Sequence, residues 1–476
     1  MTSIGKGRRR SWRTVVLWLV PLAIVAACGA RVTDEQRLAV TGVGTGTSGE
    51  VAATAAGTSG DSSGNGVVPG GDGGSGEASI RVAGDGGPTT TAFSGDNGGA
   101  TDVGVTGDTI TIGNVSTLSG PVPGLFQGAV IGTQAWVAYQ NSVGGIAGRK
   151  IKLEIRDDQF DTGQNRAATI DLIGNTFALV GGFSLYDDAA AKQMEEAGIP
   201  DIQLPLTTGL QESPINVSVN PVKRGAPSGP WNAMKDKFPD ARAAVGGLYG
   251  DVPAAKDNFL NNKHASQTVG YEWVYERGFQ PTETDFTADV VRMRQAGVKF
   301  FFTNGDVKST ARMAKAMQQQ GFRPDVFLVQ GPAYDATFIP LAGSAAEGVI
   351  NIGTQAMYLG EDASFIPEIA LMNQWLQKVK PGYKPDLFAA YGWGHGRLFA
   401  KAMESVGPKP TRPALLAALR KINEWDGYGL FSPAGPGPKR PAVCWIFEIV
   451  KNGKFERWES PPPNFRCDNT TFVYRS

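Results

Sequence analysis

Residues 109–158 read TITIGNVSTLSGPVPGLFQGAVIGTQAWVAYQNSVGGIAGRKIKLEIRDD. Apolar and polar residues alternate at 109–116 and again at 150–158, which is the two-residue period of a β-strand. Between these segments, apolar residues recur with helical spacing from Phe126 to Asn141. A strand, a helix and a second strand in this order predict two parallel strands joined by a right-handed crossover.

Strands and helices keep alternating along the rest of the chain. The alternation pauses at INVSVNPV (215–222) and then begins again, so the sequence predicts two α/β lobes in tandem. Near the end, three helices precede a hairpin that turns at Asn452-Gly453. The further predicted strands are 177–183, 200–205, 243–250, 268–275, 299–305, 325–332, 347–353, 442–450 and 454–458, and the further helices are 164–175, 188–198, 285–297, 307–321, 367–379, 387–406 and 412–422.

The amino-terminal segment predicts export. A basic cluster at residues 6–13 precedes an apolar run, 15–27, that is shorter than the roughly 20 residues of a spanning helix. The four residues that end at Cys28, VAAC, resemble a bacterial lipobox, which implies lipidation of Cys28 after cleavage. An ordinary secretory cleavage or an uncleaved anchor are the alternatives.

Composition then separates a tether from a globular part. Residues 29–105 are rich in Gly, Ser, Thr and Ala and bury too little apolar surface to fold, so we expect a disordered tether.

The whole sequence has 45 basic and 45 acidic residues, and this balance argues against nucleic acid as a partner. With only 2 histidines, a histidine-rich metal site is not expected, and no cofactor is predicted.

Cys444 and Cys467 are the two cysteines of the globular part. In an exported protein we expect them to form a disulfide, which would close a loop of about 24 residues and contribute roughly 3 kcal/mol in the chain-entropy model. Two free buried thiols are the alternative.

Five motifs occur in the order found in type I solute-binding proteins, and they resemble the leucine/isoleucine/valine-binding branch that serves ABC importers. Each motif alone is weak evidence for this family, but five motifs in the same order are strong evidence. The resemblance extends from about Asp108 to the hairpin. The long tether and the carboxy-terminal NFRCDNTTFVYRS (464–476) depart from the common form. The motifs are TLSGPVPG (117–124), VGGIAGRKIKLEIRDDQFD (143–161), ALVGGFS (178–184), GIPDIQLPLT (198–207) and TDFTADVVRMRQAGVKFFFTNG (284–305).

The resemblance implies two Rossmann-like lobes of the Venus-flytrap type, joined by a three-stranded hinge. The lobes would be residues 106–222 and 223–353, and residues 354–476 would return to the helices of lobe 1, the hinge and the hairpin. The implied function is that of a monomeric lipoprotein on the outer face of the cytoplasmic membrane. It would capture a small polar solute, foremost a branched-chain amino acid, and deliver it unconverted to an ABC permease.

The loops after two strands are implied to hold the carboxylate of such a solute. Ser184, Leu185 and Tyr186 follow a strand and open a helix, whose N-terminus favours an anion. Thr207 and Thr208 follow the next strand and belong to the same implied site. The alternative is that these residues only cap helices and form turns.

The resemblance assigns three further positions to the family's pocket. Glu283 falls where members that bind α-amino acids carry an acid for the ammonium group, although an exposed loop glutamate is the alternative. Tyr249 would offer an aromatic wall or would pack in the ordinary way. The family's aromatic residue after SGP maps to Leu125, with Phe126 adjacent, which leaves the side-chain pocket undefined.

Two other classes of function stay open. An exported hydrolase or amidase would need an activated serine, but GFSLY around Ser184 lacks the second glycine of a nucleophile elbow and no histidine follows at a suitable distance. The other open class is a ligand-sensing or surface-interaction lipoprotein with the same fold.

The carboxylates Asp157, Asp158 and Asp161 resemble a metal-binding motif. The family's pattern instead predicts a strand end and a helix cap there.

Overall fold

The computed structural model describes residues 93–475, so the predicted signal peptide, Cys28 and most of the predicted tether lie outside the described residues. Contacts divide the chain after Val82, and the described residues all belong to the second unit, Ala83–Ser476. Within 93–475, no helix is both long and apolar enough to cross a membrane.

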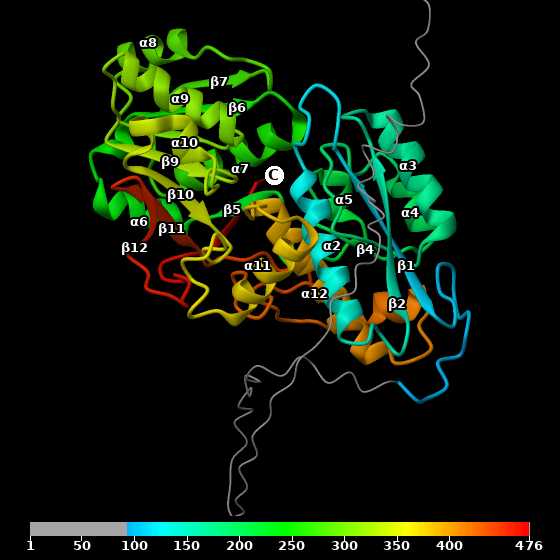
Figure 1. The fold of residues 1–476 in the computed structure, drawn as a ribbon. Coiled ribbons are helices and arrows are strands. Elements are labelled where there is room, and N and C mark those ends of the chain that lie inside the picture. The colour runs from blue at the N-terminus through cyan, green and yellow to red at the C-terminus, as the bar shows by residue number, and fades with distance from the viewer. Residues whose placement is uncertain (1–92, 476) are drawn as a thin grey trace, which may run out of the picture. The chain divides into compact units, whose positions relative to one another are not determined.

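The first lobe is built on four parallel strands in the order β2-β1-β3-β4. Ile110 and Ile112 of β1 are fully buried, as the alternation at 109–116 predicts. Helices from the end of the chain complete this lobe, because α12 and α11 pack along α2 (Figure 1). The bounds are β1 Thr109–Ser116, β2 Lys150–Asp157, β3 Ala178–Val180, β4 Asp201–Ile202, α2 Gln127–Ser142, α3 Thr162–Asn175, α4 Ala191–Glu196, α5 Thr208–Glu212, α11 Pro367–Val379, α12 Leu387–Val406 and α13 Arg412–Leu419.

The second lobe is built on seven strands in the order β12-β11-β10-β9-β8-β6-β7. Strands β10, β9, β8, β6 and β7 are parallel, and the terminal hairpin β11–β12 adds to β10 in antiparallel fashion. Phe300, Phe301 and Phe302 of β8 are all fully buried, since helices cover both faces of the parallel sheet. The bounds are β6 Val245–Gly250, β7 Trp273–Phe279, β8 Phe300–Thr303, β9 Val326–Gln330, β10 Val349–Gly353, β11 Ile446–Lys451, β12 Lys454–Trp458, α6 Gly229–Lys237, α7 Pro253–Thr268, α8 Thr287–Gln295, α9 Val307–Gln319 and α10 Phe338–Ala342, with 3-10 turns at Ala241–Ala243 and Gly343–Ala346.

The chain passes between the two sheets three times: after α5, after β10 and after α13. At the first passage, β5 (Gly225–Pro227) pairs in antiparallel fashion with β13 (Phe472–Tyr474) at the end of the chain. Cys444 and Cys467 form a disulfide with an S–S distance of 2.07 Å, as predicted.

Most predicted elements agree with the structure within a few residues. The strand predicted at 268–275 is wrong at its start, because α7 continues to Thr268 and β7 begins only at Trp273. The strand predicted at 200–205 shortens to Asp201–Ile202, since the following residues form the loop that leads to α5.

Candidate functional site

A cavity of about 360 Å³ is lined by residues of both lobes and of the passages between them. It lies at the carboxyl ends of the strands β6, β8 and β9, where Gly250, Asn304 and Gln330 line it. This is where open α/β sheets commonly bind ligands.

The wall from the first lobe is apolar and aromatic. Phe126, Phe183 and Phe388 form a cluster with ring centroids 4.8 to 5.5 Å apart, and Leu125 and Leu185 lie beside them in the cavity lining. Because such a wall offers contact area but no charge, it suits the apolar body of a solute.

The wall from the second lobe is rich in amides. Asn262 of α7 donates a 2.5 Å hydrogen bond to Gln330, and Asn304 donates one of 3.1 Å to Asn258. The Asn304 Oδ1 atom is buried without a hydrogen-bond partner. A hydrogen-bond donor inside the cavity, from a water molecule or from a solute, could satisfy this oxygen.

Polar side chains also join the passages to the first lobe. The Tyr391 hydroxyl accepts hydrogen bonds from Asn220 (3.1 Å) and from Gln355 (2.7 Å). Asn220 lies on the first passage and Gln355 on the second, and all three residues line the cavity.

Two acids and one lysine supply the charged side chains of the lining in the described range. Asp306 caps α9, because it accepts hydrogen bonds from the amides of Lys308 (2.9 Å) and Ser309 (3.1 Å). Asp257 forms an ion pair with Arg475. Lys223 is the cation of the lining.

Three of the predicted site residues, Leu125, Phe126 and Leu185, line the cavity. Tyr249 lies outside the lining and packs on Phe259, with ring centroids 4.7 Å apart. Glu283 also lies outside it and forms a 2.7 Å ion pair with Arg277.

The two loops expected to bind a carboxylate are already bonded to carboxylates of the chain itself. The Ser184 hydroxyl is buried and donates to Asp158, while it accepts a 3.0 Å hydrogen bond from the amide of Tyr186. In the other loop, Asp187 accepts from the Thr207 hydroxyl (2.5 Å) and from the Thr207 amide (3.2 Å). None of these residues lines the cavity.

Burial also changes the acidity of the carboxyl group in the second loop. It raises the pKa of Asp187 to about 8, because the charged form loses its hydration, while the hydrogen bonds from Thr207 and from the amide of Leu206 (2.6 Å) oppose that rise. Thr207 caps α5, whose first residue is Thr208. In the structure, the Ser184 hydroxyl therefore stabilises a turn and the Thr207 hydroxyl caps a helix.

The carboxylates at 157–161 also have structural partners. Asp161 caps α3 by accepting a 2.8 Å hydrogen bond from the Gln164 amide, and Asp157 accepts a 2.9 Å hydrogen bond from the Leu118 amide. Among residues 93–475, no group of three or more His, Cys, Asp or Glu residues is arranged to hold a metal ion.

Sequence reasoning did not single out Phe388, Asn304 or Phe472 as site residues. Asn304 ends a predicted strand, so the rule that ligands bind at the carboxyl ends of strands could have found it. Phe388 and Phe472 are far in sequence from the strands whose ends form the cavity, and the packing of α12 and the pairing of β13 bring them to it.

The comparisons with known proteins agree with this fold. A family model described as periplasmic binding protein matches residues 109–450. The Leu/Ile/Val-binding protein homolog 1 of Brucella suis is 24% identical over 350 residues, which cover 70% of this chain and 89% of that protein.

Solved structures share the fold at low identity. A fatty acid ABC transporter substrate-binding protein from Thermomonospora curvata has a TM-score of 0.66 at 21% identity, covering 76% of this chain and 96% of that one. A solute-binding protein of an ABC transporter from R. palustris, in complex with 4-hydroxybenzoate, has a TM-score of 0.61 at 21% identity, covering 75% and 98%. The chain therefore belongs to the periplasmic binding protein family, whose members are exported and bind small solutes for ABC transporter permeases.

Proposed function

We propose that the chain is the extracytoplasmic solute-binding protein of an ABC importer, a monomer that is lipid-anchored through Cys28. It captures a small solute in the cavity between its lobes and releases it unchanged. The observation that carries this proposal is the cavity itself, which combines an apolar wall from one lobe with an amide-rich wall from the other. Two lobes that each contribute a wall can close over a solute by a hinge motion at the passages.

The absence of chemical conversion is part of the proposal. The Ser184 hydroxyl donates to a carboxylate, Asp158, and not to a histidine that could act as a base. His395 is fully buried, and its Nε2 atom lies 3.1 Å from the Ser218 hydroxyl. These contacts favour solute binding over an exported hydrolase or amidase.

The solute that fits the cavity best has an apolar body and a single negative charge. The aromatic cluster of Phe126, Phe183 and Phe388 would cover the body, and Lys223 would attract the charge. An α-ammonium group, in contrast, would find both acids of the lining already bonded, Asp306 to a helix end and Asp257 to Arg475. We therefore propose a small carboxylic acid without an α-amino group.

A branched-chain amino acid is the second candidate. It was predicted from the sequence, and a relative named Leu/Ile/Val-binding protein homolog supports it. Two structural neighbours support the first candidate, the small carboxylic acid. One is a fatty acid ABC transporter substrate-binding protein, and the other was solved in complex with 4-hydroxybenzoate. The two candidates differ in the amino group, so a matched pair of ligands can separate them.

The test is calorimetric titration of the full chain with 4-methylpentanoate and with leucine, which differ only in the amino group. We expect 4-methylpentanoate to bind at least tenfold more tightly, a difference of about 1.4 kcal/mol. Tighter binding of leucine would establish the second candidate. If neither these ligands nor a wide solute library raised the unfolding temperature, the solute-binding function would be contradicted.

A further inference from the structure

The carboxy-terminal tail, residues 464–475, reaches the solute cavity. Its strand β13 pairs with β5, so that Phe472 faces Pro227 and Val473 faces Ala226 in the register. Phe472, Pro227 and Ala226 all line the cavity. The end of the chain therefore lies beside the first passage between the lobes.

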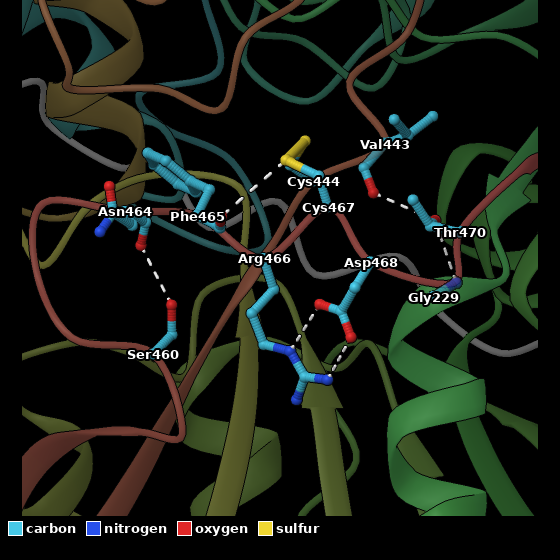
Figure 2. Close-up of a disulfide and its surroundings, with 10 residues drawn as sticks. All are labelled: Gly229, Val443, Cys444, Ser460, Asn464, Phe465, Arg466, Cys467, Asp468 and Thr470. Carbon is cyan, nitrogen blue, oxygen red and sulfur yellow. Dashed lines mark hydrogen bonds and ion pairs between the residues drawn. A yellow bond between two sulfur atoms is a disulfide. The ribbon is translucent and has the colours of Figure 1, made fainter.

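The tail is fixed at both of its ends. At its start, the disulfide joins Cys467 to Cys444 (Figure 2). Trp445 and Arg466 also exchange backbone hydrogen bonds of 2.9 and 2.7 Å. At its end, Arg475 donates a 2.7 Å hydrogen bond to Asn261 of α7 and pairs with Asp257.

Between these ends, backbone groups of the second lobe depend on the tail. The amide of Ser228 donates a 2.9 Å hydrogen bond to the Thr471 carbonyl, and the Thr471 amide donates one of 3.0 Å to the Ser228 hydroxyl. The Gly229 amide donates to the Thr470 hydroxyl, which in turn donates to the Val443 carbonyl (Figure 2). Removing the tail would leave these partly buried groups unpaired.

The chain is adapted to the tail at Gly225. A Cβ atom there would lie 2.2 Å from the carbonyl oxygen of Val473, and the residue has φ of +148°. Only glycine allows so close an approach. The family model ends at residue 450, so the tail lies outside the part of the chain that it matches.

We propose that this tail is a wall of the solute-binding site, that the Cys444–Cys467 disulfide holds it there, and that Phe472 limits the size of the solute. The proposal rests on the proposed function only in taking the cavity as the place where solute binds. A benzyl group in the lining occupies volume that a longer solute would need. Its removal should therefore favour longer acids over short ones.

The first test measures selectivity in the full chain. Calorimetric titration with 4-methylpentanoate and with 4-phenylbutanoate gives a ratio of dissociation constants for each variant. We expect Phe472→Ala to shift this ratio at least tenfold toward 4-phenylbutanoate and Phe472→Leu to shift it less. Phe365→Ala is the matched control, because Phe365 is 56% exposed and lies outside the lining, and it should leave the ratio within twofold. Equal ratios in all four proteins would overturn the role of Phe472.

The second test needs no ligand. Hydrogen exchange is measured by mass spectrometry on the full chain before and after reduction of the disulfide, and separately on Cys444→Ser/Cys467→Ser. We expect exchange at the Ser228 and Thr471 amides to accelerate at least tenfold in both cases, with the amides of β1 unchanged. Unchanged exchange at Ser228 and Thr471 would overturn the tail's attachment. Should the unaltered chain bind neither acid, the proposed solute class fails, and this experiment decides the tail by itself.

Discussion

Leu125 and Glu283 were both expected to touch the solute, but only Leu125 lines the cavity. We predict that Leu125→Asp lowers the affinity for 4-methylpentanoate at least tenfold, because a carboxylate in the apolar wall repels the anion and disrupts the contact. Glu283→Ala should change the affinity less than twofold, since that carboxylate pairs with Arg277. Calorimetric titration of both variants measures the two effects.

Leu125→Met is the control for this pair, because it keeps the volume and the apolar character of the side chain. The position of the site would be contradicted if Glu283→Ala lost affinity tenfold while Leu125→Asp kept the affinity of the unaltered chain. That result would restore the role that the family resemblance assigns to Glu283.

Glu448 provides a test of buried charge. It is fully buried in β11 and accepts a 2.9 Å hydrogen bond from Asn351. Burial raises its pKa to about 8, although the Asn351 hydrogen bond and the Arg457 charge oppose the rise. The folded state then holds a proton that the unfolded state has lost, so this residue's contribution to stability is largest below about pH 4.3 and falls as the pH rises to 8.

We therefore predict that Glu448→Gln gains stability relative to the unaltered chain between pH 5 and pH 8, by up to about 1.4 kcal/mol for each pH unit. Urea unfolding at several pH values measures the difference between the two proteins, which removes the contributions of the other acids. A difference that is constant with pH would mean that Glu448 is ionised in the folded state.

At the scale of single residues, the sequence could predict the positions that depend on neighbours in the chain. Leu185 directly follows a predicted strand and its loop, Leu125 and Phe126 follow the SGP of the family resemblance, and all three line the cavity. The hydrogen-bond partners of Ser184 and Thr207 could not be predicted. The two hydroxyls donate to the buried side chains of Asp158 and Asp187. The pattern of a strand followed by a helix does not encode which hydrogen bonds those side chains accept.

Among the elements, α2 and α12 pack so closely that a glycine is required at their contact. A Cβ atom on Gly392 would lie 2.2 Å from the Ala129 carbonyl oxygen. We predict that Gly392→Ala lowers the free energy of unfolding by about 1–3 kcal/mol, since overpacking outweighs the helix propensity of alanine. Thermal unfolding measures the change.

Gly174→Ala is the matched control for this substitution. Gly174 lies in α3, is exposed, and has nothing within 4 Å of the position of a Cβ atom. It should raise stability by up to about 1 kcal/mol, because only the helix propensity changes there. A similar gain in Gly392→Ala would contradict the close packing of α2 and α12.

Elements with local signals were predictable, and elements that exist through distant pairing were not. Helix α3 begins after Asp161, which caps it, and α13 begins after Thr411, which does the same. Strands β5 and β13 have three residues each and no alternation long enough to detect. Each is a strand because it pairs with the other, across more than half of the chain.

For the whole molecule, the proposed lipid anchor places the lobes at a membrane surface. We predict that the unaltered chain, produced in a bacterial host, sediments with membranes, whereas Cys28→Ser stays with the exported soluble fraction, because a thioether-linked diacylglyceryl group would be missing. Fractionation followed by immunoblotting measures the distribution. Membrane association of Cys28→Ser equal to that of the unaltered chain would contradict lipidation as the anchor.

Two lobes follow from the sequence because alternating strands and helices occur in two runs with a pause between them. A cleft between the lobes was expected, but the residues of its lining do not follow from the sequence, since they are as distant as Leu125, Asn304, Phe388 and Phe472. Their meeting depends on three passages between the sheets and on the return of α11 and α12 to the first lobe.

The most direct test of the account is equilibrium dialysis of the full chain against 4-methylpentanoate, followed by denaturation and mass spectrometry of the released molecule. The account predicts close to one equivalent of ligand for each chain, recovered chemically unchanged, and almost none bound to Leu125→Asp. Recovery of a transformed product, or equal binding by Leu125→Asp, would contradict the claim that the cavity between the lobes captures an apolar acid and releases it intact.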